Sequence, residues 1–162
     1  MARQEEGTIE VNEQDCIAFT SGHCSTMSPQ LIRWELNAIA WVNAYWRDRR
    51  SAASLVRVVV ALCGHVASGR RLADGTQYAD VTFGQLANDL GMESGRGSTS
   101  AVSNWIGCLC LECQPRQSGY RSAERLKQDG VAPLLSIERR ATGRGTSWRF
   151  RLVGIEPFVP LG

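Results

Sequence analysis

Two short loops share a residue pattern that suits phosphate binding. Residues 95–99 read Gly-Arg-Gly-Ser-Thr, and residues 143–147 read Gly-Arg-Gly-Thr-Ser. The glycines expose backbone amides, the hydroxyls can donate hydrogen bonds, and Arg96 and Arg144 can neutralise negative charge. Each loop could equally be a flexible turn. Neither loop is a nucleotide-binding P-loop, because both lack the Gly-Lys-Ser/Thr sequence.

The charged residues are unevenly distributed along the chain. The 162 residues include 18 basic and 16 acidic side chains, for a net charge of +2. Residues 28–73 and 114–162 each carry a net charge of +5, whereas residues 1–27 and 74–113 each carry −4. Separate basic blocks can form a local phosphate-binding surface even when the total charge is small. All basic residues except Lys127 are arginine, which a GC-rich genome would also produce.

The sequence offers little for enzyme chemistry. It has 2 histidines, His23 and His65, and it lacks a nucleophile elbow, a zinc-protease helix motif and a paired-carboxylate pattern. We therefore expect a protein that is not an enzyme, with no cofactor and no small-molecule substrate. A cysteine nucleophile with a distant histidine stays an open alternative.

The six cysteines favour a reducing compartment rather than a metal site. The first 27 residues are acidic and polar and do not resemble a secretory signal, and no apolar stretch is long enough to span a membrane. We therefore expect a cytoplasmic location with free thiols. Among Cys108, Cys110 and Cys113, only the last two have Cys-x-x-Cys spacing, so zinc would require distant ligands. The pattern favours buried thiols and no metal.

The N-terminal third predicts an acidic arm followed by a tryptophan-rich helix. Residues 1–27 form the arm, and residues 28–50 the helix, with Ser28 as its cap and Pro29 at its first position. Its apolar arc spans about half the circumference, wider than one partner element needs. This arc predicts contacts with two elements, or with one element and a second subunit. The candidate interaction residues are Trp34, Trp41, Tyr45 and Trp46.

Three further helices are expected before the C-terminal region. The first runs from Ser51 to about residue 68, and a loop follows at residues 73–80. A short helix begins after its cap, Thr82, and Gly91 ends it. A glycine-rich turn leads to a helix that starts between residues 98 and 100 and ends near Glu112. Its outer surface is expected to include Cys108, Cys110 and Leu111.

The C-terminal region predicts a β-hairpin after a polar loop. Residues 114–132 are read as a loop, with a helical turn near residues 123–128. Apolar and polar residues then alternate on both sides of a glycine-containing turn at residues 141–146, which is typical of a two-stranded ribbon. Residues 154–162 form an irregular tail. The expected fold class is mainly α with a β-hairpin, an α+β arrangement.

This order of elements resembles the winged helix–turn–helix family across residues 51–153. The helix–turn–helix motif is Val-Thr-Phe-Gly-Gln-Leu-Ala-Asn-Asp-Leu-Gly-Met at residues 81–92, followed by Ser-Ala-Val-Ser-Asn-Trp-Ile at residues 100–106. The wing corresponds to residues 134–140 and 148–152. The resemblance implies a winged-helix core, extended here by the N-terminal helix. Residues 78–135 are also similar to short uncharacterised proteins of bacteria and their mobile elements, which names no activity.

The resemblance implies a regulator or accessory factor that binds double-stranded DNA. The recognition helix would be residues 99–111 and the wing residues 139–149, with the helix in the major groove and wing arginines on phosphates. The implied nucleic-acid-binding residues are Arg96, Ser98, Thr99, Ser100, Ser103, Asn104, Arg139, Arg140, Arg144 and Arg149.

A protein-interaction module is the alternative. The recognition helix has no Arg or Lys between Ser98 and Glu112, and its segment carries a net charge of −4, which phosphate would repel. Because a fold does not fix a function, the same scaffold could serve as an assembly subunit or inhibitor from a phage or mobile element, as a monomer or a dimer. It would then bind its partner through the tryptophan-rich helix.

Overall fold

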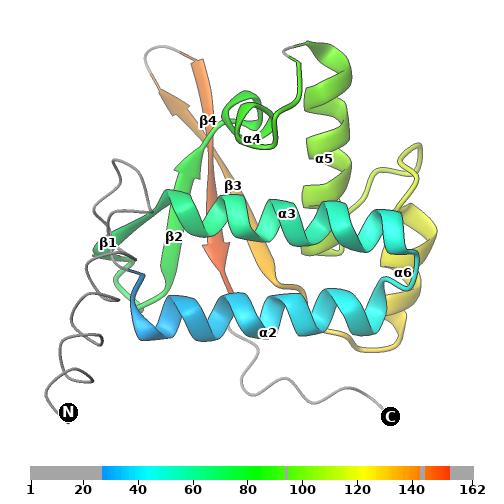
Figure 1. Ribbon diagram of the computed structural model, residues 1–162, viewed down its shortest axis with the longest axis horizontal. Helices are drawn as coiled ribbons and strands as arrows, with labels where there is room; N and C mark the ends of the chain where they lie inside the picture. The colour runs from blue at the N-terminus through cyan, green and yellow to red at the C-terminus, as the bar shows by residue number, and fades with distance from the viewer. Residues whose placement is uncertain (1–26, 94, 143–144, 154–162) are drawn as a thin grey trace, which may run out of the picture.

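The computed structural model describes residues 27–93, 95–142 and 145–153. These residues form five α-helices and a four-stranded antiparallel sheet (Figure 1). The elements in chain order are α2 (Pro29–Tyr45), α3 (Arg49–His65), β1 (Val66–Arg71), β2 (Gln77–Val81), α4 (Phe83–Asp89), α5 (Arg96–Cys110), α6 (Tyr120–Gln128), β3 (Leu135–Thr142) and β4 (Gly145–Leu152). The predicted α+β class is confirmed. The predicted acidic arm before Met27, Arg144 and the tail at 154–162 lie outside the described residues.

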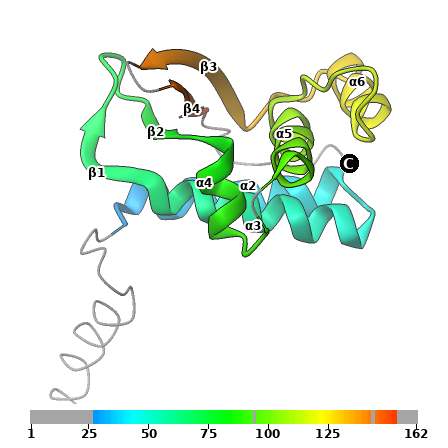
Figure 2. The same cartoon turned by 90° about the horizontal axis from the view of Figure 1, so that it is seen from above.

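The hairpin belongs to a larger sheet with the strand order β1-β2-β4-β3. β4 lies between β2 and β3, so Phe150 pairs with both Ala79 and Ile137. The predicted hairpin is confirmed as β3–β4, and the structure adds that β4 also pairs with β2. Figure 2 shows α2 and α3 on one side of this sheet, with α6 beyond the sheet at the far end of α3.

Two strands were missed because their sequence signals are short. The helix expected to reach residue 68 ends at His65, and Val66 adopts an extended backbone where β1 begins. The expected loop at 73–80 contains the start of β2, in which Ala79 and Val81 are buried and Asp80 is exposed. This alternation is that of a strand with one buried face, but it spans too few residues to outweigh the turn signal at Asp74-Gly75.

Side-chain caps set the helix boundaries. Ser28 accepts a hydrogen bond from the Leu31 amide, as predicted for the start of α2. Asp48 accepts one from the Ser51 amide, so α3 begins at Arg49. Arg49 and Arg50 therefore open α3, whereas the sequence analysis placed them at the end of α2. α5 also begins earlier than expected, at Arg96, and α6 is a full helix rather than a turn.

The tryptophans of α2 form part of the core. Trp34, Trp41 and Trp46 are at most 7% exposed. The Trp34 Nε1 donates a hydrogen bond to the Val153 carbonyl (3.2 Å), and the Trp41 Nε1 donates one to the Ala132 carbonyl (3.1 Å). These bonds attach α2 to the segments that follow α6 and β4. The wide apolar arc thus packs within the chain, and the prediction that these three rings face a partner was wrong.

Candidate nucleic-acid interface

The α4–α5 pair is held against α3 at the end of α4. Thr82 caps α4 as predicted, and the structure shows that Gln85 completes a capping box with it. At the other end, Arg57 of α3 donates a hydrogen bond to the Leu90 carbonyl (2.5 Å), and the His65 Nε2 lies 2.5 Å from the Asp89 carboxylate. These contacts fix the short helix and therefore the direction in which α5 leaves it.

A polar groove runs along the outer side of α5. It has a volume of about 560 Å³ and is lined by Phe83, Thr99, Ser100, Ser103, Arg116 and Gln117. Arg96 is exposed at the start of α5. Ser98 donates its hydroxyl hydrogen to the Glu93 carbonyl, and Thr99 donates to the Arg96 carbonyl (3.1 Å). Of the predicted residues on α5, Thr99, Ser100 and Ser103 share the groove.

The loop between α5 and α6 covers the adjacent side of α5. The Gln117 Nε2 donates to the Ser103 Oγ (3.4 Å), and the Asn104 Nδ2 donates to the Ser118 Oγ (3.2 Å). The Asn104 Oδ1 also accepts a bond from the Gly119 amide (3.2 Å). Both ends of the Asn104 amide are therefore engaged within the chain, so Asn104 positions the loop rather than facing the groove.

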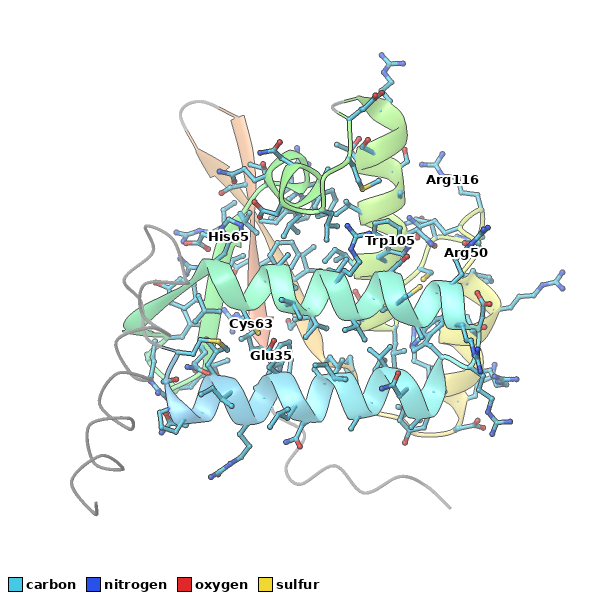
Figure 3. The ribbon with its side chains drawn as sticks, in the orientation of Figure 1. Glu35, Arg50, Cys63, His65, Trp105 and Arg116 are labelled. Atoms are coloured by element: carbon cyan, nitrogen blue, oxygen red, sulfur yellow. The ribbon has the colours of Figure 1, made fainter. Side chains whose placement is uncertain are left out.

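Arg116 and Gln117 are groove residues that sequence reasoning missed. They belong to the stretch at 114–132 that was read only as a loop, and Figure 3 shows Arg116 projecting outward beside α5. The one available signal was the basic charge of residues 114–162.

The end of α5 differs from its prediction. Cys108, Cys110 and Leu111 were expected on the surface of this helix, but all three are buried.

On the outer face of the sheet, acidic side chains pair with three of the hairpin arginines. The Arg149 Nε and Nη2 donate to the two oxygens of Asp80 (2.9 and 3.0 Å), and Arg140 lies 3.7 Å from the same carboxylate. Arg149 also lies over the Tyr78 ring at 4.3 Å, and its side chain is 17% exposed. Arg151 is paired with Glu138 (3.3 Å). Arg149 therefore links β4 to β2.

Arg139 lies on the opposite face of the hairpin, the face toward the helices. It is exposed and sits directly across from Trp148 in the strand register. Trp148 stacks on Phe83, with ring centroids 5.2 Å apart and an interplanar angle of 5°. Since Phe83 also lines the α5 groove, the aromatic pair connects that groove to Arg139.

Two of the described thiols, Cys63 and Cys110, are suited to packing rather than to chemistry. Burial raises the pKa of Cys63 and of Cys110 to about 12 in each case, so both are neutral thiols near pH 7. Glu35 lies beside Cys63 between α2 and α3 (Figure 3), and burial raises its pKa. Within residues 27–93, 95–142 and 145–153, no cluster of three His, Cys, Asp or Glu side chains could hold a metal ion. None of the helices in these ranges could cross a membrane.

Comparison of the chain with protein-family models, with curated proteins and with solved structures found no match.

Proposed function

We propose that this protein binds double-stranded DNA, with α5 in the major groove and the β3–β4 hairpin beside the phosphate backbone. The order of elements from α3 through β2, α4, α5, β3 and β4, with the three strands ordered β2-β4-β3, supports a winged helix–turn–helix layout. In that layout the second helix of the pair reads base edges. A non-enzymatic role, a cytoplasmic location and a bacterial or phage origin belong to the same proposal.

The groove along α5 is the observation that carries this proposal. Its wall includes the hydroxyls of Thr99, Ser100 and Ser103, whereas both ends of the Gln117 amide are bonded within the chain. Hydroxyl groups can donate to or accept from base edges. Arg116 lies in the groove wall, and Arg96 is exposed at the start of the helix. These two arginines can supply the phosphate contacts that the helix itself lacks after residue 98.

The phosphate contacts are assigned to the arginines that the fold leaves exposed. Arg96 is exposed at the start of α5, Arg116 lines the groove, and Arg139 and Arg140 are exposed on β3, Arg140 at 44%. Arg149 is assigned no phosphate contact, because its guanidinium already binds both oxygens of Asp80. Phosphate contacts of this kind supply affinity without sequence preference.

An electrophoretic mobility shift with duplex DNA of mixed sequence tests the proposal. Four phosphate contacts give a slope of about −3.6 for log affinity against log salt, or a loss of about 100-fold between about 50 and 200 mM salt. A complex that forms at low salt and weakens in this way supports DNA binding. If no complex forms at low salt, the protein does not act through this surface.

A protein partner is the second candidate, and the outer side of α2 is the observation that favours it. Ile32 and Leu36 lie one helical turn apart and are 45% and 63% exposed. Neighbouring exposed apolar side chains often mark interaction surfaces. The molar mass in solution, measured by light scattering, tests this candidate. A wild-type mass above that of the monomer, or a co-purifying protein, would support this candidate if Leu36→Ser abolishes the association. A wild-type chain that is monomeric and purifies alone would count against it.

A further inference from the structure

A second cavity lies at the end of the molecule away from the hairpin. Its volume is about 400 Å³, and it is formed where the α2–α3 link, the start of α3, the side of α5 and the start of α6 meet. Figure 3 shows Arg50 and Trp105 at this end, from α3 and α5 respectively. The volume falls within the range of cavities that bind small molecules, about 300–1,000 Å³.

Three arginines from three elements line this cavity. Arg47 comes from the α2–α3 link, Arg50 from the first turn of α3 and Arg125 from α6. None of the three forms an ion pair with an acidic side chain in the described part of the chain. The one acidic residue in the wall, Asp48, accepts hydrogen bonds from the Ser51 hydroxyl (2.8 Å) and amide (3.1 Å). The cavity therefore has an excess of positive charge.

The N-terminus of α6 adds to this positive potential, whereas the Asp48 carboxylate already caps that of α3. α6 begins at Tyr120. The residue that precedes α6, Gly119, lines the cavity and offers no side chain to cap the helix. Ser122 in the first turn of α6 also lines it. The positive ends of helix dipoles and the exposed amides of a first turn favour bound anions, phosphate in particular.

The cavity also has an aromatic wall. Trp105 lines it and is half-buried, so part of its indole ring is accessible. Trp46 lines it as well, and the Trp46 Nε1 is buried without a hydrogen-bond partner among the described residues. Because less than 1 Å² of that nitrogen is accessible, it is out of reach of a ligand in the cavity. Flat ligand rings stack on such aromatic side chains.

We propose that this cavity binds a phosphate monoester attached to a flat ring, a ligand of mononucleotide size. The phosphate would lie among Arg47, Arg50 and Arg125, and the ring would lie against Trp105. The site is separate from the groove of the proposed DNA interface, because the α5–α6 loop, bonded to Ser103 and Asn104, lies between the two. The proposal therefore does not depend on DNA binding.

Calorimetric titration of the full chain with adenosine 5′-monophosphate, adenosine and inorganic phosphate tests the proposal. We expect saturable 1:1 binding of the monophosphate. Adenosine and inorganic phosphate should each bind at least about tenfold more weakly, because each lacks one half of the recognised chemistry. A 5′-phosphorylated trinucleotide distinguishes a free nucleotide from the 5′ end of a nucleic-acid strand as the ligand. A site for strand ends would bind the trinucleotide more tightly than the free nucleotide.

Charge-reversal variants place the binding in the cavity. Arg50→Glu and Arg125→Glu should each weaken binding of the monophosphate by about tenfold or more. Arg96→Glu, which makes the same change of charge on the α5 side, should leave it unchanged. As a measurement that does not depend on the charge variants, the monophosphate should alter tryptophan emission in the wild type, and the change should be smaller in Trp105→Phe, which keeps Trp46 in the wall. The proposal is overturned if the monophosphate does not saturate, if adenosine or phosphate binds as tightly, or if Arg96→Glu weakens binding as much as the cavity variants.

Discussion

The guanidinium of Arg149 makes two hydrogen bonds to the carboxylate of Asp80, across the join between β4 and β2. The residues are 69 positions apart in the chain, and they face each other directly in the strand register. Arg149 was expected to contact DNA, but in this pair it links β4 to β2. Arg96 at the start of α5, Arg116 in the α5–α6 loop and Arg139 on β3 are exposed.

Asp80→Asn tests the structural role of this pair. The hydrogen bonds from Arg149 lower the pKa of Asp80. Stabilisation from such a group is fully present above the unfolded pKa of about 3.9 and is lost as the pH falls through the lower folded value. Because Asp80 is partly exposed, we expect the variant to lose only about 1 kcal/mol at pH 7. Urea unfolding should show this loss shrinking as the pH falls below about 3.9. Glu138→Gln, which breaks the single bond to Arg151, is the matched control and should cost less. Equal costs for both variants at pH 7 would contradict the account.

Gly119→Ala tests the packing of the α5–α6 loop. A Cβ atom at Gly119 would collide with the Cys108 Sγ and would lie 3.2 Å from the Cys113 Sγ. We expect a loss of about 1–3 kcal/mol in the free energy of unfolding, and addition of Cys108→Ala should recover part of it.

Gly64→Ala is the control for this substitution. Gly64 lies within α3, and a Cβ atom there would have no neighbour within 4 Å. Alanine should therefore stabilise the helix by about 0.5–1 kcal/mol. The packing account fails if Gly119→Ala is as stable as the wild type, or if Cys108→Ala recovers nothing.

Alkylation by iodoacetamide tests the burial of the thiols. Burial raises the pKa of Cys63 and Cys110 to about 12, so at about pH 8 almost none of either thiol is the reactive thiolate. Peptide mass spectrometry should show both cysteines modified far more slowly in the native chain than in urea. Native labelling of Cys63 or Cys110 at the denatured rate would show that these side chains are not enclosed.

The sequence predicted the elements that carry strong local signals. Ser28 with Pro29 predicted the start of α2, and Thr82 predicted that of α4, because a helix cap depends on neighbours within three residues. Alternation on both sides of a glycine-containing turn predicted the β3–β4 hairpin. β2 was missed because its pairing with β4 is a long-range contact that its own five residues do not reveal.

The candidate site was predicted only in part. Thr99, Ser100 and Ser103 were identified from the order of elements, and the structure brings them into one groove. Arg116 and Gln117 reach that groove because Asn104 and Ser103 bind the loop that carries them. No local pattern marks a loop that folds back on a helix. The role of Arg149 was missed for a similar reason, since its partner Asp80 belongs to a distant strand.

Fluorescence anisotropy of a labelled duplex, titrated at several salt concentrations, tests DNA binding through the α5 side most directly. Arg96→Ala with Arg116→Ala should weaken binding uniformly across sequences and reduce the salt slope by about 2, because each phosphate contact contributes about 1. Arg33→Ala with Arg121→Ala removes the same charge from exposed positions on α2 and α6 and should leave the slope unchanged. Equal slopes for the two double variants, or wild-type binding that does not respond to salt, would contradict the account.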